Sequence, residues 1–492
     1  MKKINKTKKK MIILTVLVIT INFLLIPSIN AQIKNKFENR QIIQKLNYSQ
    51  SKDIDLLIIT VKRFSTILES LTDHKKDVGI SSKIVTINNI YNGEIFETKG
   101  RDKQEQIKYF IKNAIEEWNI TYVLIVGGAR EIPSRYSNTV MYDTDQPDWY
   151  NHPAKTEFMS DLYYADIYDS EGNFSSWDNN NNGIYAEWKG KVAEDYDIDL
   201  YPDVFLGRLP CRNRLEVRIV INKIISYERE TYGKSWFKNI AVVAGDTDPR
   251  YWIPRWRKYE GEITSQEILN NMTNFGHTKL WTSNGNLKNR MDVIKTFYQG
   301  IGFIYFNGHG NPLGCLTLKP RELDGYIRCL DIYSIPLLMN GKKLPISFLA
   351  VCSGCNFNVS LLKIFDEESS ITGDFAPECW GWHLVRKPWG GSIASLGYTG
   401  IAYVDLDKDS GQGAGDYIEN QFFWEYGVNN TDILGKVWGN TITNYLNTFQ
   451  INWSTRAGCD YAIDAESVEN FVLLGDPSLK IGGYNESEIT KK

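Results

Sequence analysis

Residues 345–355 read PISFLAVCSGC, and residues 302–310 read GFIYFNGHG. Each stretch begins with apolar, β-branched and aromatic residues, a composition that predicts a buried strand. The first strand runs into Cys352 and the second runs into His309. Because ligands of open parallel sheets bind outside the carboxyl ends of the strands, neighbouring strands would bring this thiol and this imidazole to one edge. The two stretches therefore predict an α/β fold and the position of its functional site.

Strands and helices alternate along most of the chain. Residues 55–128 predict the order strand, helix, strand, helix, strand, and residues 204–230 predict a short strand and an amphipathic helix. The second half opens with the strand NIAVVAG (239–245) and continues with helices around 264–275 and 288–299. This alternation is typical of a mostly parallel sheet covered by helices.

The length of 492 residues predicts more than one domain. We expect an N-terminal α/β subdomain at residues 32–235, with an Asp- and Asn-rich insertion of loops at 136–200. A catalytic subdomain at 236–483 and a tail at 484–492 complete the predicted organisation.

The N-terminus predicts export. Six lysines precede an apolar run at 11–27, and small residues lead to Ala31, which indicates a signal peptide over residues 1–31. The apolar run is long enough that an uncleaved membrane anchor stays an alternative. In both cases we expect the remaining chain outside the cytoplasm, either secreted or anchored to the cell surface. A net charge of −3 without a basic stripe excludes a nucleic-acid partner, and we expect a monomer.

The pair Cys352 and Cys355 allows three interpretations. Zinc would need two more ligands at metal spacing, and the sequence has no second Cys-x-x-Cys and no paired histidines. A thiol–disulfide motif is expected to open a helix near the start of its domain. A nucleophilic thiol needs a base, and His309 can supply it. Backbone N–H groups of Gly310 and Cys352 could then bind an oxyanion. The nucleophile is favoured, and the redox pair stays open.

Together the two stretches resemble the gingipain family of cysteine peptidases. That family has a His-Gly after one strand, a Cys at the end of a later strand, and an aromatic residue five positions after the Cys, where this chain has Phe357. The resemblance selects Cys352 over Cys355 as the nucleophile. Further matching segments follow in the family's order: VFLGRLP to YERE (204–230), FGHTKLW (275–281), CWGWHLVRKPWGGSIASLGYTG (379–400) and FVLLGDPSLKI (471–481). The resemblance implies a caspase-like three-layer α/β/α fold with two adjacent subdomains and mostly parallel sheets.

The resemblance also implies roles around the dyad of Cys352 and His309. An acidic residue after the first strand of the catalytic subdomain would orient the imidazole, and Asp246 lies there, with Asp248 as second choice. The family's acidic residue at the foot of the primary pocket falls beside Gly261, so that Glu260 or Glu262 would bind a basic substrate side chain. Tyr403 falls where an aromatic residue would cover that pocket.

Two acidic stretches predict calcium. WDNNNNGIYAE approaches the EF-hand spacing with Asp178, Asn180, Asn182 and Glu187, and DLDKDSGQGAGD does so with Asp405, Asp407 and Asp409. The alternative in each case is a solvated acidic loop. Family members bind calcium for stability, which favours metal. The ion would be structural, since a thiolate peptidase needs no cofactor for catalysis.

The sequence as a whole predicts an exported cysteine endopeptidase that hydrolyses proteins or peptides through an acyl-enzyme, with a preference for a basic residue before the scissile bond. An amine in place of water as the acceptor stays open. Two other classes also stay open: a catalytically silent surface protein that binds through the same fold, and a thiol–disulfide protein that uses Cys352 and Cys355.

Overall fold

A computed structural model describes residues 53–139, 157–189, 192–196, 198–247, 259–319, 325–366, 369, 372–404, 413–457 and 460–489. The predicted signal segment lies outside the described residues, and so do Asp248, Asp405, Asp407 and Asp409. Within the described ranges, no helix combines the length and the apolar character that crossing a membrane requires.

Ten strands form one continuous sheet, and all neighbouring pairs are parallel except β16 with β17. The order across the sheet is β10 (Gly276–Trp281), β9 (Asn239–Ala244), β11 (Phe303–Asn307), β15 (Ile346–Ala350), β16 (Ala394–Tyr398), β17 (Phe471–Leu474), β8 (Phe205–Leu209), β3 (Tyr122–Val126), β1 (Leu56–Thr60) and β2 (Ser82–Thr86). The mostly parallel sheet is confirmed. β17, from the C-terminal end of the chain, joins the two predicted halves, whose boundary at 235 stays a prediction.

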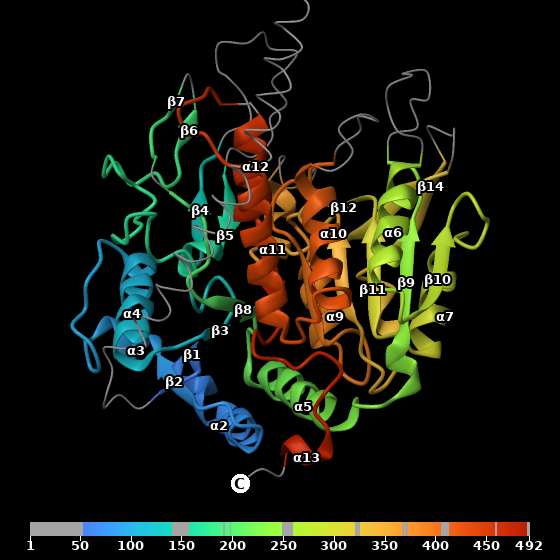
Figure 1. Cartoon of the computed structure of the whole chain (residues 1–492), viewed down its shortest axis with the longest axis horizontal. Helices are drawn as coiled ribbons and strands as arrows, with labels where there is room; N and C mark the ends of the chain where they lie inside the picture. Colours follow the sequence, from blue (N-terminus) through green and yellow to red (C-terminus); the bar gives the residue numbers. More distant parts are fainter. Residues whose placement is uncertain are drawn as a thin grey trace, which may run out of the picture. The chain divides into compact units, whose positions relative to one another are not determined.

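Helices cover both faces of this sheet, which makes the three-layer α/β/α architecture (Figure 1). On one face pack α2 (Lys62–Asp77), α5 (Arg214–Glu230) and α9 (Trp380–Arg386). On the other face pack α6 (Glu260–Asn271), α10 (Ala414–Gly427), α11 (Leu434–Thr448) and α12 (Asp460–Glu469). The remaining helices are α3 (Ile87–Tyr91), α4 (Lys103–Trp118), α7 (Arg290–Gln299) and α13 (Glu486–Ile489).

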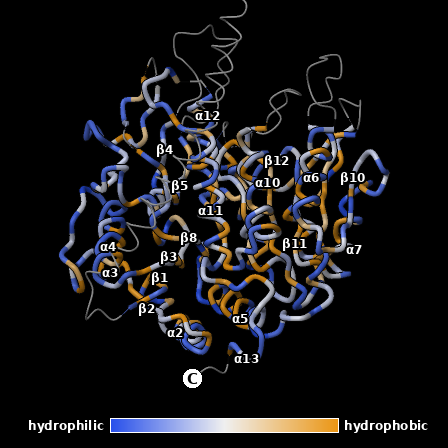
Figure 2. Tube along the Cα trace, viewed as in Figure 1, coloured by the Kyte–Doolittle hydropathy of each residue, from blue (hydrophilic) through white to orange (hydrophobic). Residues whose placement is uncertain are grey.

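The predicted apolar patterns form the core between these layers. All five residues of β1, β3, β11 and β15 are buried, and Figure 2 shows hydrophobic residues concentrated along β11 and its neighbours. In α5, Val217, Val220, Ile221 and Ile224 are buried on one face, as their spacing predicts. Asn213 caps this helix by accepting hydrogen bonds from the amides of Leu215 and Glu216.

A buried ion cluster holds the segment after β17 against the N-terminal half. Lys75 Nζ lies 2.8 Å from Asp476 Oδ2 and 2.9 Å from Glu228 Oε2, and all three side chains are inaccessible to solvent or nearly so. Lys75 comes from α2 and Glu228 from α5. Asp476 belongs to the GDPSL segment, so this motif anchors the end of the chain to two helices far away in sequence.

Short strands form three small sheets: β12 (His309–Asn311), β13 (Gly314–Leu318) and β14 (Tyr326–Asp331); β4 (Arg135–Ser137) and β5 (Phe158–Ser160); and β6 (Trp188–Lys189) and β7 (Val192–Ala193). The last four lie in the segment predicted as loops. The order of the large sheet reverses direction twice, between β1 and β3 and between β9 and β11. In open α/β sheets, ligands bind at such reversals, outside the carboxyl ends of the strands.

Candidate active site

His309 and Cys352 lie at the same edge of the sheet because their strands are neighbours. β11 pairs with β15 in parallel, and in this register Asn307 is opposite Ala350. His309 and Cys352 each follow two residues after that last pair. The strand pairing predicted from the sequence is therefore present, and it places imidazole and thiol at equivalent positions beyond two adjacent strands.

The chain turns sharply after Cys352. Ser353 adopts the left-handed conformation with φ 52°, which is strained for a residue with a side chain. Its amide donates to the Gly400 carbonyl at 2.6 Å, and the Cys355 amide donates to the Tyr398 carbonyl at 3.0 Å. These bonds fold the loop onto the end of β16. They leave the Cys352 thiol partly exposed, whereas the Cys355 thiol is buried.

Close packing requires the two glycines that flank His309. A Cβ at Gly310 would lie 2.7 Å from the Cβ of Val351, and one at Gly308 would lie 2.4 Å from the Leu316 carbonyl oxygen. Both distances are shorter than van der Waals contact. The glycines therefore let the hairpin of β12 and β13 lie directly against the residue before the nucleophile.

A main-chain carbonyl orients the imidazole. His309 Nε2 lies 2.7 Å from the Thr247 carbonyl oxygen, so Nε2 carries a proton and donates it to this carbonyl. The sequence predicted the carboxylate of Asp246 in this role. Asp246 is buried and bonds through its backbone to Leu318, and the contact of Nε2 is made by the neighbouring Thr247. The role of Asp246 stays a prediction. Among the described residues, no hydrogen bond joins His309 to Cys352.

Burial dominates the electrostatics of the thiol. It raises the pKa of Cys352 above its ordinary value, and the nearby carboxyl of Glu466 acts in the same direction. The thiol makes one long contact, 3.9 Å to the Ala402 carbonyl. Cys352 is therefore a neutral thiol at rest, and forming the thiolate requires a base.

The two glutamates predicted for the primary pocket differ in their partners. Glu262 accepts hydrogen bonds from the Ser283 amide at 2.9 Å, from Thr282 Oγ1 at 3.0 Å and from Ser283 Oγ, so both oxygens of its carboxylate have donors. Glu260 accepts from the amide and hydroxyl of Thr247 through Oε1. Its Oε2 is buried without a hydrogen-bond partner among the described residues. Glu260 therefore holds the residue that orients His309 and has one buried oxygen without a donor among the described residues.

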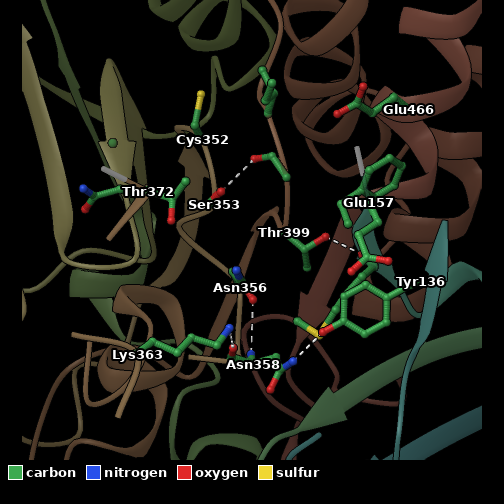
Figure 3. Close-up of a pocket in the computed structure, with 16 residues that line it drawn as sticks. Tyr136, Glu157, Cys352, Ser353, Asn356, Asn358, Lys363, Thr372, Thr399 and Glu466 are labelled. Atoms are coloured by element: carbon green, nitrogen blue, oxygen red, sulfur yellow. Dashed lines mark hydrogen bonds between the residues drawn. The ribbon is translucent and has the colours of Figure 1, made fainter. Parts of the chain in front are cut away.

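A cavity of about 510 Å³ opens beside the nucleophile (Figure 3). Its walls include Cys352, Gly310 and Thr399 from the C-terminal half of the chain and Tyr136 and Glu157 from the N-terminal half. A buried carboxyl, that of Glu466 on α12, also lines it. The hydroxyl of Tyr403, the residue predicted to cover the primary pocket, donates to Glu466 Oε2 at 2.8 Å.

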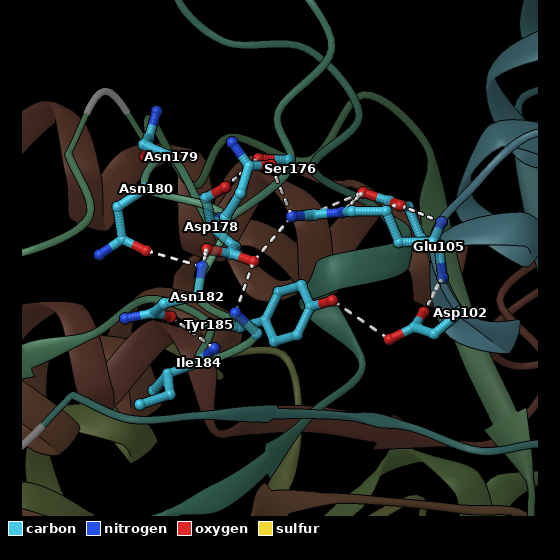
Figure 4. A network of polar contacts seen from close by, with 12 residues as sticks. Asp102, Glu105, Ser176, Asp178, Asn179, Asn180, Asn182, Ile184 and Tyr185 are labelled. Atoms are coloured by element: carbon cyan, nitrogen blue, oxygen red, sulfur yellow. Dashed lines mark hydrogen bonds and ion pairs between the residues drawn. The ribbon is translucent and has the colours of Figure 1, made fainter.

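The first predicted calcium loop is held by protein donors (Figure 4). Arg101 Nη1 lies 2.7 Å from Asp178 Oδ2, and the amides of Asn182 and Gly183 donate to the same carboxylate at 3.1 Å. Asn182 Nδ2 donates to Glu187 Oε2 at 2.7 Å, and Asn180 Oδ1 accepts from the Asn182 amide.

A guanidinium and N–H donors thus point at the oxygens that a cation would need, so this arrangement does not fit calcium. The described ranges hold no group of three or more His, Cys, Asp or Glu residues placed for a metal. Calcium at either loop stays a prediction.

Some of these groups could be predicted from the sequence and others could not. Cys352, His309 and Gly310 come together as predicted, and Glu260 lies close by through Thr247. Thr247 was not predicted, because a main-chain carbonyl has no signature in a sequence. Glu466 was not predicted either, since an isolated glutamate on a helix carries no motif.

Comparisons with known proteins agree with this architecture. Residues 49–482 match the model of peptidase family C25. Gingipain R2 of Porphyromonas gingivalis is 20% identical over 332 residues, which cover 67% of this chain and 36% of that protein. An uncharacterized protein of Archaeoglobus fulgidus is 22% identical over 395 residues, which cover 73% of this chain and 78% of that protein. The chain thus spans about a third of the length of gingipain R2.

Solved structures show the same fold. The crystal structure of the Arg-specific cysteine proteinase gingipain R superimposes with a TM-score of 0.58 at 17% identity, covering 88% of this chain and 80% of that one. The complex of the pro- and mature domains of RgpB from Porphyromonas gingivalis gives a TM-score of 0.57 at 16% identity, covering 87% and 79%. The chain therefore belongs to peptidase family C25, the family of the gingipain cysteine peptidases.

Proposed function

We propose that this protein is a cysteine endopeptidase with Cys352 as nucleophile and His309 as base. The observation that carries the proposal is the parallel register of β11 and β15, which sets both residues two positions beyond the pair of Asn307 and Ala350. The absence of a bond between thiol and imidazole is compatible with catalysis, because such contacts often form only when substrate binds.

In the proposed reaction, Cys352 Sγ attacks the carbonyl carbon of the scissile bond while His309 Nδ1 takes the thiol proton. The Nε2–H bond to Thr247 holds the ring in this tautomer. Amide N–H groups of Gly310 and Cys352 bind the oxyanion. His309 returns the proton to the leaving amine, and a thioester remains on Cys352. Water then attacks the thioester, loses a proton to His309, and releases the carboxylic acid and the thiol.

The carboxylate of Glu260 favours substrates with a basic side chain before the scissile bond. Of the two candidate glutamates, only Glu260 has a buried carboxylate oxygen without a hydrogen-bond partner among the described residues. A guanidinium or ammonium group would supply a charge-assisted hydrogen bond to that oxygen. Glu262, with three donors, is a structural support for α6 in this proposal.

The location of the protein belongs to the same proposal. The lysines and the apolar run of the N-terminal segment support export from the cytoplasm, where a peptidase would meet protein substrates.

The test is labelling of the full chain with a peptidyl electrophile that ends in arginine, followed by mass spectrometry and a cleavage assay. We expect one adduct, on Cys352, and loss of labelling and cleavage in Cys352→Ala by at least about 10³-fold. Cys355→Ala serves as the matched control, because its thiol is three residues away and fully buried.

Each other result supports a different function. Equal losses in Cys352→Ala and Cys355→Ala would indicate thiol–disulfide chemistry. No labelling of the wild-type chain would indicate a binding protein that keeps the fold. If Glu260→Gln is still labelled by the arginine electrophile, Glu260 does not belong to the primary pocket. The peptidase assignment is unaffected by that result.

A further inference from the structure

Glu466 faces the cavity beside Cys352 and is 5% exposed. It lies on α12, immediately before β17. Its carboxyl accepts hydrogen bonds from the Tyr403 hydroxyl at 2.8 Å and from the Ile401 amide. Figure 3 shows Glu466 on the side of the cavity where Glu157 also lies, across from Lys363.

No basic side chain of the described part of the chain pairs with Glu466. Lys363, the cation that lines the same cavity, donates to the Asn358 carbonyl and lies 4.0 Å from Asp374. Burial raises the pKa of Glu466 to about 8. A buried carboxyl without a cation is costly to ionise, and an incoming cation would remove that cost.

Several other buried acids of this protein have a cation of their own. Asp161 pairs with Arg208, and Glu228 and Asp476 both pair with Lys75. Glu466 differs from them because it lines a cavity large enough for a substrate side chain. At Glu466 a ligand can therefore supply the positive charge that Arg208 and Lys75 supply to the other acids.

We propose that Glu466 makes this cavity a subsite for a positively charged side chain of the substrate, separate from the position at Glu260. The inference rests on the proposed peptidase function. The two acids lie on opposite sides of the nucleophile strand β15: Glu260 follows β9, two strands away in one direction, and Glu466 precedes β17, two strands away in the other. One extended peptide that crosses Cys352 can therefore reach both.

The experiment uses the full chain with Cys352→Ala, which binds substrate without cleaving it. Fluorescent peptides with one fixed arginine carry either lysine or norleucine, its neutral analogue, at each of the flanking positions in turn. Dissociation constants are measured by anisotropy. We expect one position at which lysine binds at least about tenfold more tightly than norleucine. In the double variant Cys352→Ala/Glu466→Gln this ratio should fall close to one.

Glu469→Gln in the same background is the matched control. Glu469 lies one turn further along α12, is equally buried, and bonds to Ser137 and Thr139 instead of lining the cavity. It should leave the lysine-to-norleucine ratio unchanged. The subsite is overturned if the lysine-to-norleucine ratio is the same with and without Glu466→Gln, or if lysine is preferred at no position. Glu466 then only supports Tyr403 and Ile401. A Glu466-dependent ratio in a chain whose Cys352 is never labelled would retain the subsite and reject the peptidase.

Discussion

Acids of the two halves of the sheet differ in their partners. In the N-terminal half, three arginines pair with acids: Arg208 with Asp161, Arg135 with Asp102 and Arg101 with Asp178. In the other half, Glu419, Glu466 and Glu469 are buried with hydroxyl or amide partners, and burial raises the pKa of each to about 8. Of these three acids, Glu466 lines the cavity beside Cys352, where a substrate could bring charge.

Arg208 connects the N-terminal half to the loop after the nucleophile. Its guanidinium binds both oxygens of Asp161 and the carbonyls of Gly127 and Ile132. It also lies 4.9 Å from the ring centre of Phe357, in the loop that follows the nucleophile. The Gly-Arg segment and the aromatic residue five positions after Cys352 are therefore spatial partners. This contact explains in physical terms two motifs that the sequence presents separately.

The largest expected effect comes from removing this cation. Arg208→Met leaves the Asp161 carboxylate buried and unpaired, and we expect a loss of about 3–5 kcal/mol in the free energy of unfolding. Chemical denaturation measures it. Arg63→Met is the control at the same edge, because the Arg63 side chain is 52% exposed and its pair with Glu131 should contribute at most about 1 kcal/mol. Equal losses in both variants would contradict the assignment of Arg208 and Asp161 as a buried pair that the fold depends on.

The strands and the dyad could be predicted because their signals are local. Apolar runs bounded by Gly308 or Cys352 identify strands without knowledge of the partner. The single ten-stranded sheet could not be predicted, since the short strand β17 pairs with β16 and β8 only after distant segments meet. The orientation of His309 by Thr247 depends on a backbone atom. The position of Glu466 depends on the 400–403 segment folding back over α12, which no local pattern encodes.

The second prediction uses pH to reveal the unpaired acids. The folded pKa of Glu469 is raised from 4.5 to about 8, first by burial. The folded chain therefore keeps a proton that the unfolded chain releases, and the free energy of unfolding falls as pH rises from about 4.5 to about 8. Glutamine cannot ionise, so Glu469→Gln should gain stability relative to wild type as pH rises, by about 4 kcal/mol at pH 8. Thermal unfolding across this range measures the difference, and parallel curves would show that Glu469 is ionised in the folded protein.

The smallest expected effect concerns the loop at Asp178, where we expect Arg101 to take the place of a metal ion. Arg101→Met should cost about 1–2 kcal/mol, because the Asp178 side chain is buried while that of Arg101 is 37% exposed. Melting temperatures of wild type and of Asp178→Asn are measured with calcium and with a chelator. They show whether calcium or Arg101 pairs with Asp178. If Arg101 is the counter-ion, any calcium-dependent increase is the same in both proteins, because it arises elsewhere in the chain. A calcium-dependent increase that disappears in Asp178→Asn would place the metal at this loop and would show that Arg101 is not the only counter-ion of Asp178.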